Sequence, residues 1–134
     1  KLDRGLVWLA TENGLTSYDG YSIKQLPGPD NRFIDTSVYS VKQDKDGWLW
    51  INASDGLYRF QPKTNQYQLV FESNLERYVA DVVVGKDNTG QEGTWIATGK
   101  KIVFYSTDEQ KLTTTLDLSK ELLEQNNIFN IIKT

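Results

Sequence analysis

One sequence pattern occurs three times in this chain: an apolar run centred on Trp, a tight turn, and a second run that ends in an aromatic residue. The copies read GLVWLATENGLTSY, GWLWINASDGLYRF and EGTWIATGKKIVFY, at 5–18, 47–60 and 92–105. Their anchors Trp8, Trp50 and Trp95 are 42 and 45 residues apart. A fixed period of this length indicates a repeat architecture in which each copy forms one small unit.

The Trp run of each copy is apolar at successive positions, which is typical of a strand covered on both of its faces. We therefore interpret Trp8, Trp50 and Trp95 as packing residues repeated for the core, not as platforms for stacking sugars. In the first two copies Asn13-Gly14 and Asp55-Gly56 follow the run, and these pairs predict hairpins with type I′ turns. Gly14 and Gly56 are thus structural residues of the repeat.

The other segments complete a four-stranded unit. Apolar segments at 37–41, 78–84 and 127–132 predict first strands, and β-rich segments at 21–26, 66–71 and 111–118 predict last strands. Segment 119–127 predicts a short helix with Ser119 as its N-cap. The expected fold is all-β, a partial β-propeller of about three four-stranded antiparallel blades. Their predicted bounds are about 5–27, 36–72 and 78–118, followed by the first strand of a next blade at about 128–133.

This arrangement leaves the first blade without its innermost strand and places an extra innermost strand at the C-terminus. Three blades do not close a ring, because known propellers use roughly four to eight. Two completions are open: the remaining blades of a longer parent protein, or self-association in which each copy lends its last strand to the first blade of another. The absence of Met, also at position 1, favours a segment of a longer chain.

The composition excludes several classes of function. The net charge is −3 and no basic stripe occurs, so nucleic-acid binding has no electrostatic basis. Without Cys or His, thiolate chemistry and His-based catalysis are absent from this segment. No apolar run reaches the roughly 20 residues that cross a bilayer, and we expect no membrane contact. Asp44–Gly47 lacks the distal ligands of a calcium loop. We predict no cofactor, metal or catalytic residue, and interpret the carboxylate pairs Asp117/Glu121 and Glu72/Glu76 as solvated surface.

The repeats resemble the two-component regulator propeller family, whose pattern is D-x-x-G-x-L-W-I-x-x-x-x-G-L-x-x-F. The second copy matches best, through Asp44, Gly47, 49–51, 56–57 and Phe60. The first copy matches through 7–9, 14–15 and Tyr18, whereas the third keeps 95–96 and has Lys-Ile in place of Gly-Leu. The resemblance implies the periplasmic sensor region of a bacterial inner-membrane receptor with a histidine kinase, hybrid two-component or diguanylate cyclase output. It also implies a response to carbohydrates in many cases.

The predicted ligand side follows from strand order. In an up-and-down blade, the turns between the second and third strands lie at the same end as the connections between blades, and loops on a rigid scaffold commonly carry function. These segments are 12–13, 54–55, 99–100, 27–35, 72–78 and 119–127. The predicted ligand-binding residues are Arg32, Asp35, Asp55, Arg77 and Tyr78.

The leading prediction is a non-enzymatic ligand-sensing module that recognises an oligosaccharide, another small molecule or a partner domain. One alternative is a propeller scaffold for protein–protein interaction. Another is an enzyme, since the Trp strands also resemble those of streptogramin-lyase-like propellers. That family is expected to use a His and a divalent metal, and this chain has no His.

Overall fold

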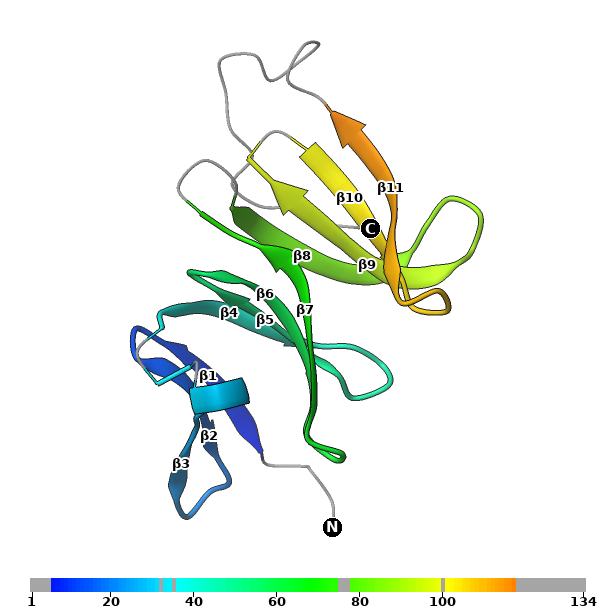
Figure 1. Cartoon of the computed structure of the whole chain (residues 1–134). Helices are drawn as coiled ribbons and strands as arrows, with labels where there is room; N and C mark the ends of the chain where they lie inside the picture. Colours follow the sequence, from blue (N-terminus) through cyan, green and yellow to red (C-terminus); the bar gives the residue numbers. More distant parts are fainter. Residues whose placement is uncertain (1–5, 32, 35, 75–77, 100, 118–134) are drawn as a thin grey trace.

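The computed structural model describes residues 6–31, 33–34, 36–74, 78–99 and 101–117, and these residues form three antiparallel sheets (Figure 1). The N-terminal sheet contains β1 (Val7–Thr11), β2 (Gly14–Tyr18) and β3 (Ile23–Leu26). The middle sheet contains β4 (Val38–Gln43), β5 (Leu49–Ala53), β6 (Gly56–Gln61) and β7 (Gln66–Glu72). The C-terminal sheet contains β8 (Val79–Lys86), β9 (Glu92–Thr98), β10 (Lys101–Ser106) and β11 (Lys111–Asp117).

Strand order within each sheet follows the chain, because every pair of consecutive strands in a sheet is antiparallel and joined by a short connection. The predicted all-β class is confirmed, as is the division into sheets of three or four antiparallel strands. Among the described residues, the N-terminal sheet has three strands and the other two sheets have four. The predicted helix at 119–127 and the predicted strand at 128–133 lie outside the described residues.

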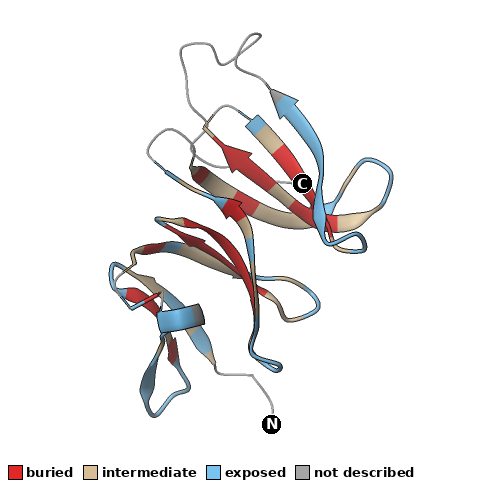
Figure 2. Ribbon diagram, viewed as in Figure 1, coloured by how far each residue is buried: buried red, intermediate tan, exposed pale blue. Residues whose placement is uncertain are grey.

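The middle sheet is covered on both faces, and all residues of β5 and β6 are buried (Figure 2). One face packs against the N-terminal sheet around Leu49, Ile51 and Phe60. The other face packs against the C-terminal sheet around Trp50 and Leu57. Since side chains alternate along a strand, two covered faces require apolar residues at successive positions. This packing explains the unbroken apolar run around Trp50.

The connection after β3 contributes to the core as well as to the surface. It contains a single 3₁₀ turn, η1 (Pro29–Asn31), and then Phe33, which is fully buried. The Phe33 ring meets Tyr58 edge-on with ring centroids 5.1 Å apart. Phe33 is thus a buried anchor within 27–35, a segment predicted only as a connection on the ligand side.

The β1–β2 and β5–β6 turns differ from the predicted type. Thr11 pairs with Gly14 and Ala53 pairs with Gly56, so the loop residues are 12–13 and 54–55 and each Gly begins the next strand. Neither Asn13 nor Asp55 has a positive φ, which a type I′ turn requires. The type I′ prediction is therefore wrong. The glycines are needed for close approach, since a Cβ on Gly14 would collide with the Phe33 carbonyl oxygen and one on Gly56 would lie 2.8 Å from the Phe71 carbonyl oxygen.

The turns that precede the second and third Trp strands are built alike. Asp44 Oδ1 accepts hydrogen bonds from the backbone amides of Asp46 and Trp48, both at 3.0 Å. Asp87 Oδ1 accepts from the amides of Thr89 and Gln91 at 2.8 and 2.9 Å. The D-x-x-G pattern of the repeat is therefore a turn closed by its own carboxylate. The third copy keeps this turn as Asp87–Gly90.

Candidate ligand-binding surface

The β5–β6 turn and the connection from β7 to β8 meet at one end of the middle sheet. The Ser54 amide donates to the Ser37 carbonyl oxygen at 2.9 Å, and the Ser73 amide donates to the Asp55 carbonyl oxygen at 3.0 Å. The Tyr58 hydroxyl donates to Asp55 Oδ2 at 3.1 Å. These bonds hold the turn against both neighbouring connections, so this end of the sheet is a fixed surface.

A hollow of about 540 Å³ opens at this end, on the boundary between the middle and C-terminal sheets. We call it the Tyr39 hollow. Tyr39 on β4 is 65% exposed and Tyr78 is half-buried, so two phenol side chains are available there. The residues that line the hollow are Tyr39, Asn52, Ala53, Ser54, Ser73, Asn74, Tyr78 and Val79.

Two contacts lie beside the Tyr39 hollow, one across the sheet boundary and one within the C-terminal sheet and its connections. The Asn52 side-chain amide donates to the Val79 carbonyl oxygen at 3.1 Å, and this bond is buried. The Tyr78 phenol lies against Gly99, where an added Cβ would be 3.0 Å from the phenol oxygen. A ligand in the hollow would therefore touch side chains of both sheets at once.

The chemistry of the Tyr39 hollow is aromatic and neutral. Its lining residues offer phenol, amide and hydroxyl groups and carry no charged side chain. The Ser73 hydroxyl is buried and has no hydrogen-bond partner among the described residues. Aromatic rings with a few polar groups suit a ligand that has an apolar face and hydroxyl or amide edges, such as a sugar ring or a peptide segment.

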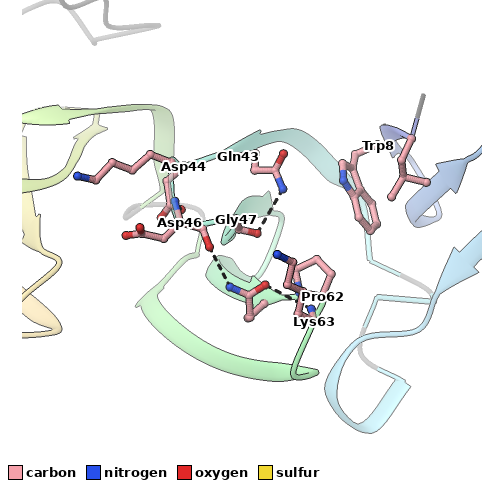
Figure 3. Close-up of a pocket in the computed structure, with 10 residues that line it drawn as sticks. Trp8, Gln43, Asp44, Asp46, Gly47, Pro62 and Lys63 are labelled. Atoms are coloured by element: carbon pink, nitrogen blue, oxygen red, sulfur yellow. Dashed lines mark hydrogen bonds between the residues drawn. The ribbon is translucent and has the colours of Figure 1, made fainter. Parts of the chain in front are cut away.

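A second hollow of about 480 Å³ lies at the opposite end of the middle sheet, beside Trp8 (Figure 3). Its polar groups bond to one another: Gln43 Nε2 donates to the Gly47 carbonyl oxygen at 3.3 Å, and Gln61 Nε2 donates to the Asp46 carbonyl oxygen at 3.2 Å. Its wall is the Asp44 turn, whose carboxylate closes the turn itself. This hollow is explained by turn structure, and we take the Tyr39 hollow as the candidate site.

The structure places two of the predicted ligand residues and omits three. Tyr78 lines the Tyr39 hollow. The Asp55 carboxylate accepts a hydrogen bond from the Tyr58 hydroxyl. The Asp55 carbonyl oxygen accepts one from the Ser73 amide and so holds Ser73 at the rim of the Tyr39 hollow. Arg32, Asp35 and Arg77 lie outside the described residues. The predicted packing residues are placed as follows: Trp50 is buried, Trp8 and Trp95 are half-buried, and Gly14 and Gly56 begin β2 and β6.

Sequence reasoning missed Tyr39 and Asn52, whereas Asn74 lies in the predicted ligand-side segment 72–78 without having been singled out. The sequence signal that could have found them is a residue that differs from those at the equivalent position of the other copies. Asn52 replaces the Ala10 and Ala97 of the other copies. Tyr39 lies at a register shift of β4, and Ala80 occupies the corresponding shift of β8. A position that changes between copies, while the packing positions stay apolar, is a candidate for function and not for the fold.

The described residues contain no group of three or more His, Cys, Asp or Glu side chains placed to hold a metal ion. Within the same part of the chain, no helix has the length and apolar character needed to cross a membrane.

Comparison with known proteins places the fold. No family model matches the sequence, and no curated protein matches it significantly. Solved structures do match. The extracellular domain of BT3049, a candidate hybrid two-component system of B. thetaiotaomicron, aligns over 98% of this chain with a TM-score of 0.67 and 18% identity. That of BT4673, a candidate hybrid two-component system of the same organism, aligns over 98% with a TM-score of 0.66 and 18% identity.

A second structure of the BT4673 extracellular domain, described as a candidate one-component system, aligns over 87% of this chain with a TM-score of 0.65 and 20% identity. This chain spans 16–24% of the length of these three chains. The fold of this chain is thus the fold of a segment of such extracellular domains, in agreement with the two-component regulator resemblance of its repeats.

Proposed function

We propose that this chain is part of the ligand-sensing region of a bacterial two-component receptor. Its three sheets would be blades of a β-propeller, with the first blade lacking its innermost strand. The module would lie in the periplasm, as the extracytoplasmic part of an inner-membrane receptor, and would have no enzymatic activity itself. A histidine kinase or diguanylate cyclase elsewhere in the parent protein would supply the output.

The observation that carries the proposal is the shared fold with extracellular domains of candidate two-component systems over 87–98% of this chain. The Tyr39 hollow supports the ligand-sensing part. It lies at the end where turns and inter-sheet connections gather, and it combines exposed aromatic rings with neutral polar groups. These groups favour an oligosaccharide or another uncharged polar small molecule over an ion.

The position of the hollow suggests how binding would be transmitted. Tyr39 and Asn52 belong to the middle sheet, whereas Tyr78 and Val79 lead into the C-terminal sheet. A ligand that contacts both would favour one relative orientation of the two sheets. A ligand shifts such an equilibrium only by its difference in affinity for the two orientations. The output domain would respond to that shift.

A thermal-shift screen of this chain against neutral oligosaccharides tests the proposal. We expect at least one sugar to raise the melting temperature in a concentration-dependent way, since a ligand that binds only the folded state stabilises it. Tyr39→Ala should need at least a tenfold higher ligand concentration to reach the same shift in melting temperature. Tyr21→Ala is the control, because Tyr21 is 97% exposed in the β2–β3 turn. Equal shifts in both variants would refute the Tyr39 hollow as the site.

A protein–protein interaction scaffold is the second candidate. The observation that favours it is an apolar face on the N-terminal sheet, where Val7 and Leu9 are 47% and 40% exposed. The two candidates differ in their expected ligands. A scaffold would give no thermal shift with any sugar, whereas a sensor would.

A further inference from the structure

The register shifts of the four-stranded sheets lie at the edges of these sheets. Four strands have a neighbour on one side only: β4 and β7 in the middle sheet, and β8 and β11 in the C-terminal sheet. The pairing of each of them with its neighbour contains one register shift. The pairings of the interior strands with each other, β5 with β6 and β9 with β10, are regular. Among the described strands of the two sheets, β-bulges are thus a property of the edges.

The extra residue of each bulge belongs to the edge strand. In β4, for example, Val38 and Ser40 pair with consecutive residues of β5, so the residue between them has no partner in the ladder. The four residues left out of the ladder in this way are Tyr39, Val70, Ala80 and Thr113. An extra residue bends the strand that contains it and interrupts the ladder. The interior strands therefore stay regular, and only the edge strands are kinked.

The outer strand of the N-terminal sheet, β3, pairs regularly with β2 but has other features of a protected edge. It contains four residues, the second of which is Lys24, and Pro27 and Pro29 follow it. A short strand, a lysine and a proline are alternative means by which natural sheets keep an edge from pairing. Strand β1 stands at the place of β5 and β9 in the repeat, and like them it pairs regularly with the next strand. The long edge strands of the four-stranded sheets thus carry a bulge, whereas the short β3 does without one.

Strand β11 shows most clearly what a bulge can prevent. It has seven residues, KLTTTLD, with three consecutive threonines and with charged residues at its two ends only. Each of residues 111–116 is exposed. β-Branched residues favour strands, and a sheet edge with high β propensity, low net charge and no proline is a template for a strand of another chain. The bulge at Thr113 interrupts this segment near its middle.

We infer that the bulges keep the edges of these sheets from adding a further strand, so that copies of this chain do not associate through β4, β7, β8 or β11. A new strand needs backbone amides and carbonyl groups at regular spacing along the edge, and a bulge removes that regularity and increases the local twist. The placement supports this role, because all four extra residues lie on the strand that a new strand would meet. The inference concerns assembly, and it is independent of the proposed ligand sensing.

Deletion of Thr113 tests the inference. The deletion removes the extra residue of β11 and leaves the other pairs between β10 and β11 in register, including Leu112 with Tyr105. Thr113 is exposed, so the core loses no side chain. We expect the folded variant to associate, with an average mass in light scattering at least about twofold above that of the wild-type chain at equal concentration. Thr113→Ala keeps the bulge and should give the wild-type mass. A folded deletion variant with the wild-type mass would overturn the inference.

A second substitution distinguishes strand pairing from other contacts. Thr115 is exposed on β11, and Thr115→Lys in the deletion variant should return the mass to the wild-type value, because a lysine on an exposed edge strand opposes pairing. Association that persists would contradict the inference. Deletion of Val70 tests the bulge of β7 in the same way if circular dichroism shows that the first deletion variant does not fold. If neither deletion variant folds, the bulges are needed for the packing of the sheets, and the inference is wrong.

Discussion

The guanidinium carbon of Arg59 lies 3.9 Å from the centroid of the Trp48 ring, between the middle and C-terminal sheets. Arg59 is 3% exposed. Its Nη1 donates to Gln68 Oε1 and to the Tyr105 hydroxyl oxygen, both at 3.1 Å. The Tyr105 ring is also 5.1 Å from the guanidinium carbon. A buried cation is thus held by neutral partners and aromatic faces, which suits the weakly hydrated, planar guanidinium group.

Substitutions of Arg59 should show that the shape of this side chain affects the free energy of unfolding more than its charge does. We expect Arg59→Lys to lower the free energy of unfolding by about 2–3 kcal/mol, because a strongly hydrated ammonium cannot stack on these rings. Arg59→Met should cost less, about 1 kcal/mol, since the Tyr105 hydroxyl and Gln68 remain bonded to each other at 2.7 Å. Urea denaturation of both variants checks the order. A more stable Lys variant would contradict it.

Asp44 should contribute to stability through its turn. Its carboxylate accepts the two backbone amides of the turn and also the Trp50 indole N–H at 3.2 Å. Asp44→Ala leaves these donors unpaired and should cost about 1–3 kcal/mol. Asp46→Ala in the same exposed turn is the control and should change the free energy of unfolding by less than about 0.5 kcal/mol. Equal effects in thermal denaturation would show that the carboxylate is not needed.

The equivalent Asp87 should add a measurable acid dependence. A hydrogen bond from the Thr89 hydroxyl, with others from backbone amides, holds the pKa of Asp87 below its ordinary value of 3.8. Since the folded-state pKa is the lower one, the stabilisation is complete above that value and is lost as the pH falls through the folded-state pKa. Asp87→Asn should make the free energy of unfolding less dependent on pH in this acidic range. Denaturation between about pH 5 and pH 2 checks it, and a curve parallel to the wild-type curve would argue against the assignment.

Phe33 should anchor the connection between the N-terminal and middle sheets. It is fully buried against Tyr58, and Phe→Ala changes in cores cost about 3–5 kcal/mol. Ile34→Ala is the neighbouring control, because Ile34 is 38% exposed. It should cost less than about 1 kcal/mol. Similar losses of stability in the two variants would mean that the connection contributes little to the core.

The spacing of the Trp residues was sufficient to predict separate antiparallel sheets, because a strand covered on both faces must be apolar at successive positions. Turn type was not predictable in the same way. Asn-Gly and Asp-Gly favour type I′ turns as isolated pairs, but Gly14 and Gly56 are selected here by close contacts with Phe33 and with β7. Those contacts are distant in the sequence and become visible only in the folded chain.

The candidate site was only partly predictable, for a related reason. Strand order indicated the end of the sheets at which Tyr78 lines a hollow. Tyr39 and Asn52 were missed because they lie within strands, and the search considered only loops. A β-bulge turns Tyr39 outward, and a shift of one residue in register decides which face a side chain occupies.

The middle sheet packs one face against the preceding sheet and the other against the following sheet, so the stack of sheets has a direction. The side chains of Ile51 and Ile96 face the preceding sheet, and the side chain of Trp50 faces the following sheet. A duplication or deletion of one whole repeat would therefore keep this direction of stacking, whereas contacts specific to one repeat, such as that of Arg59 with Tyr105, would change.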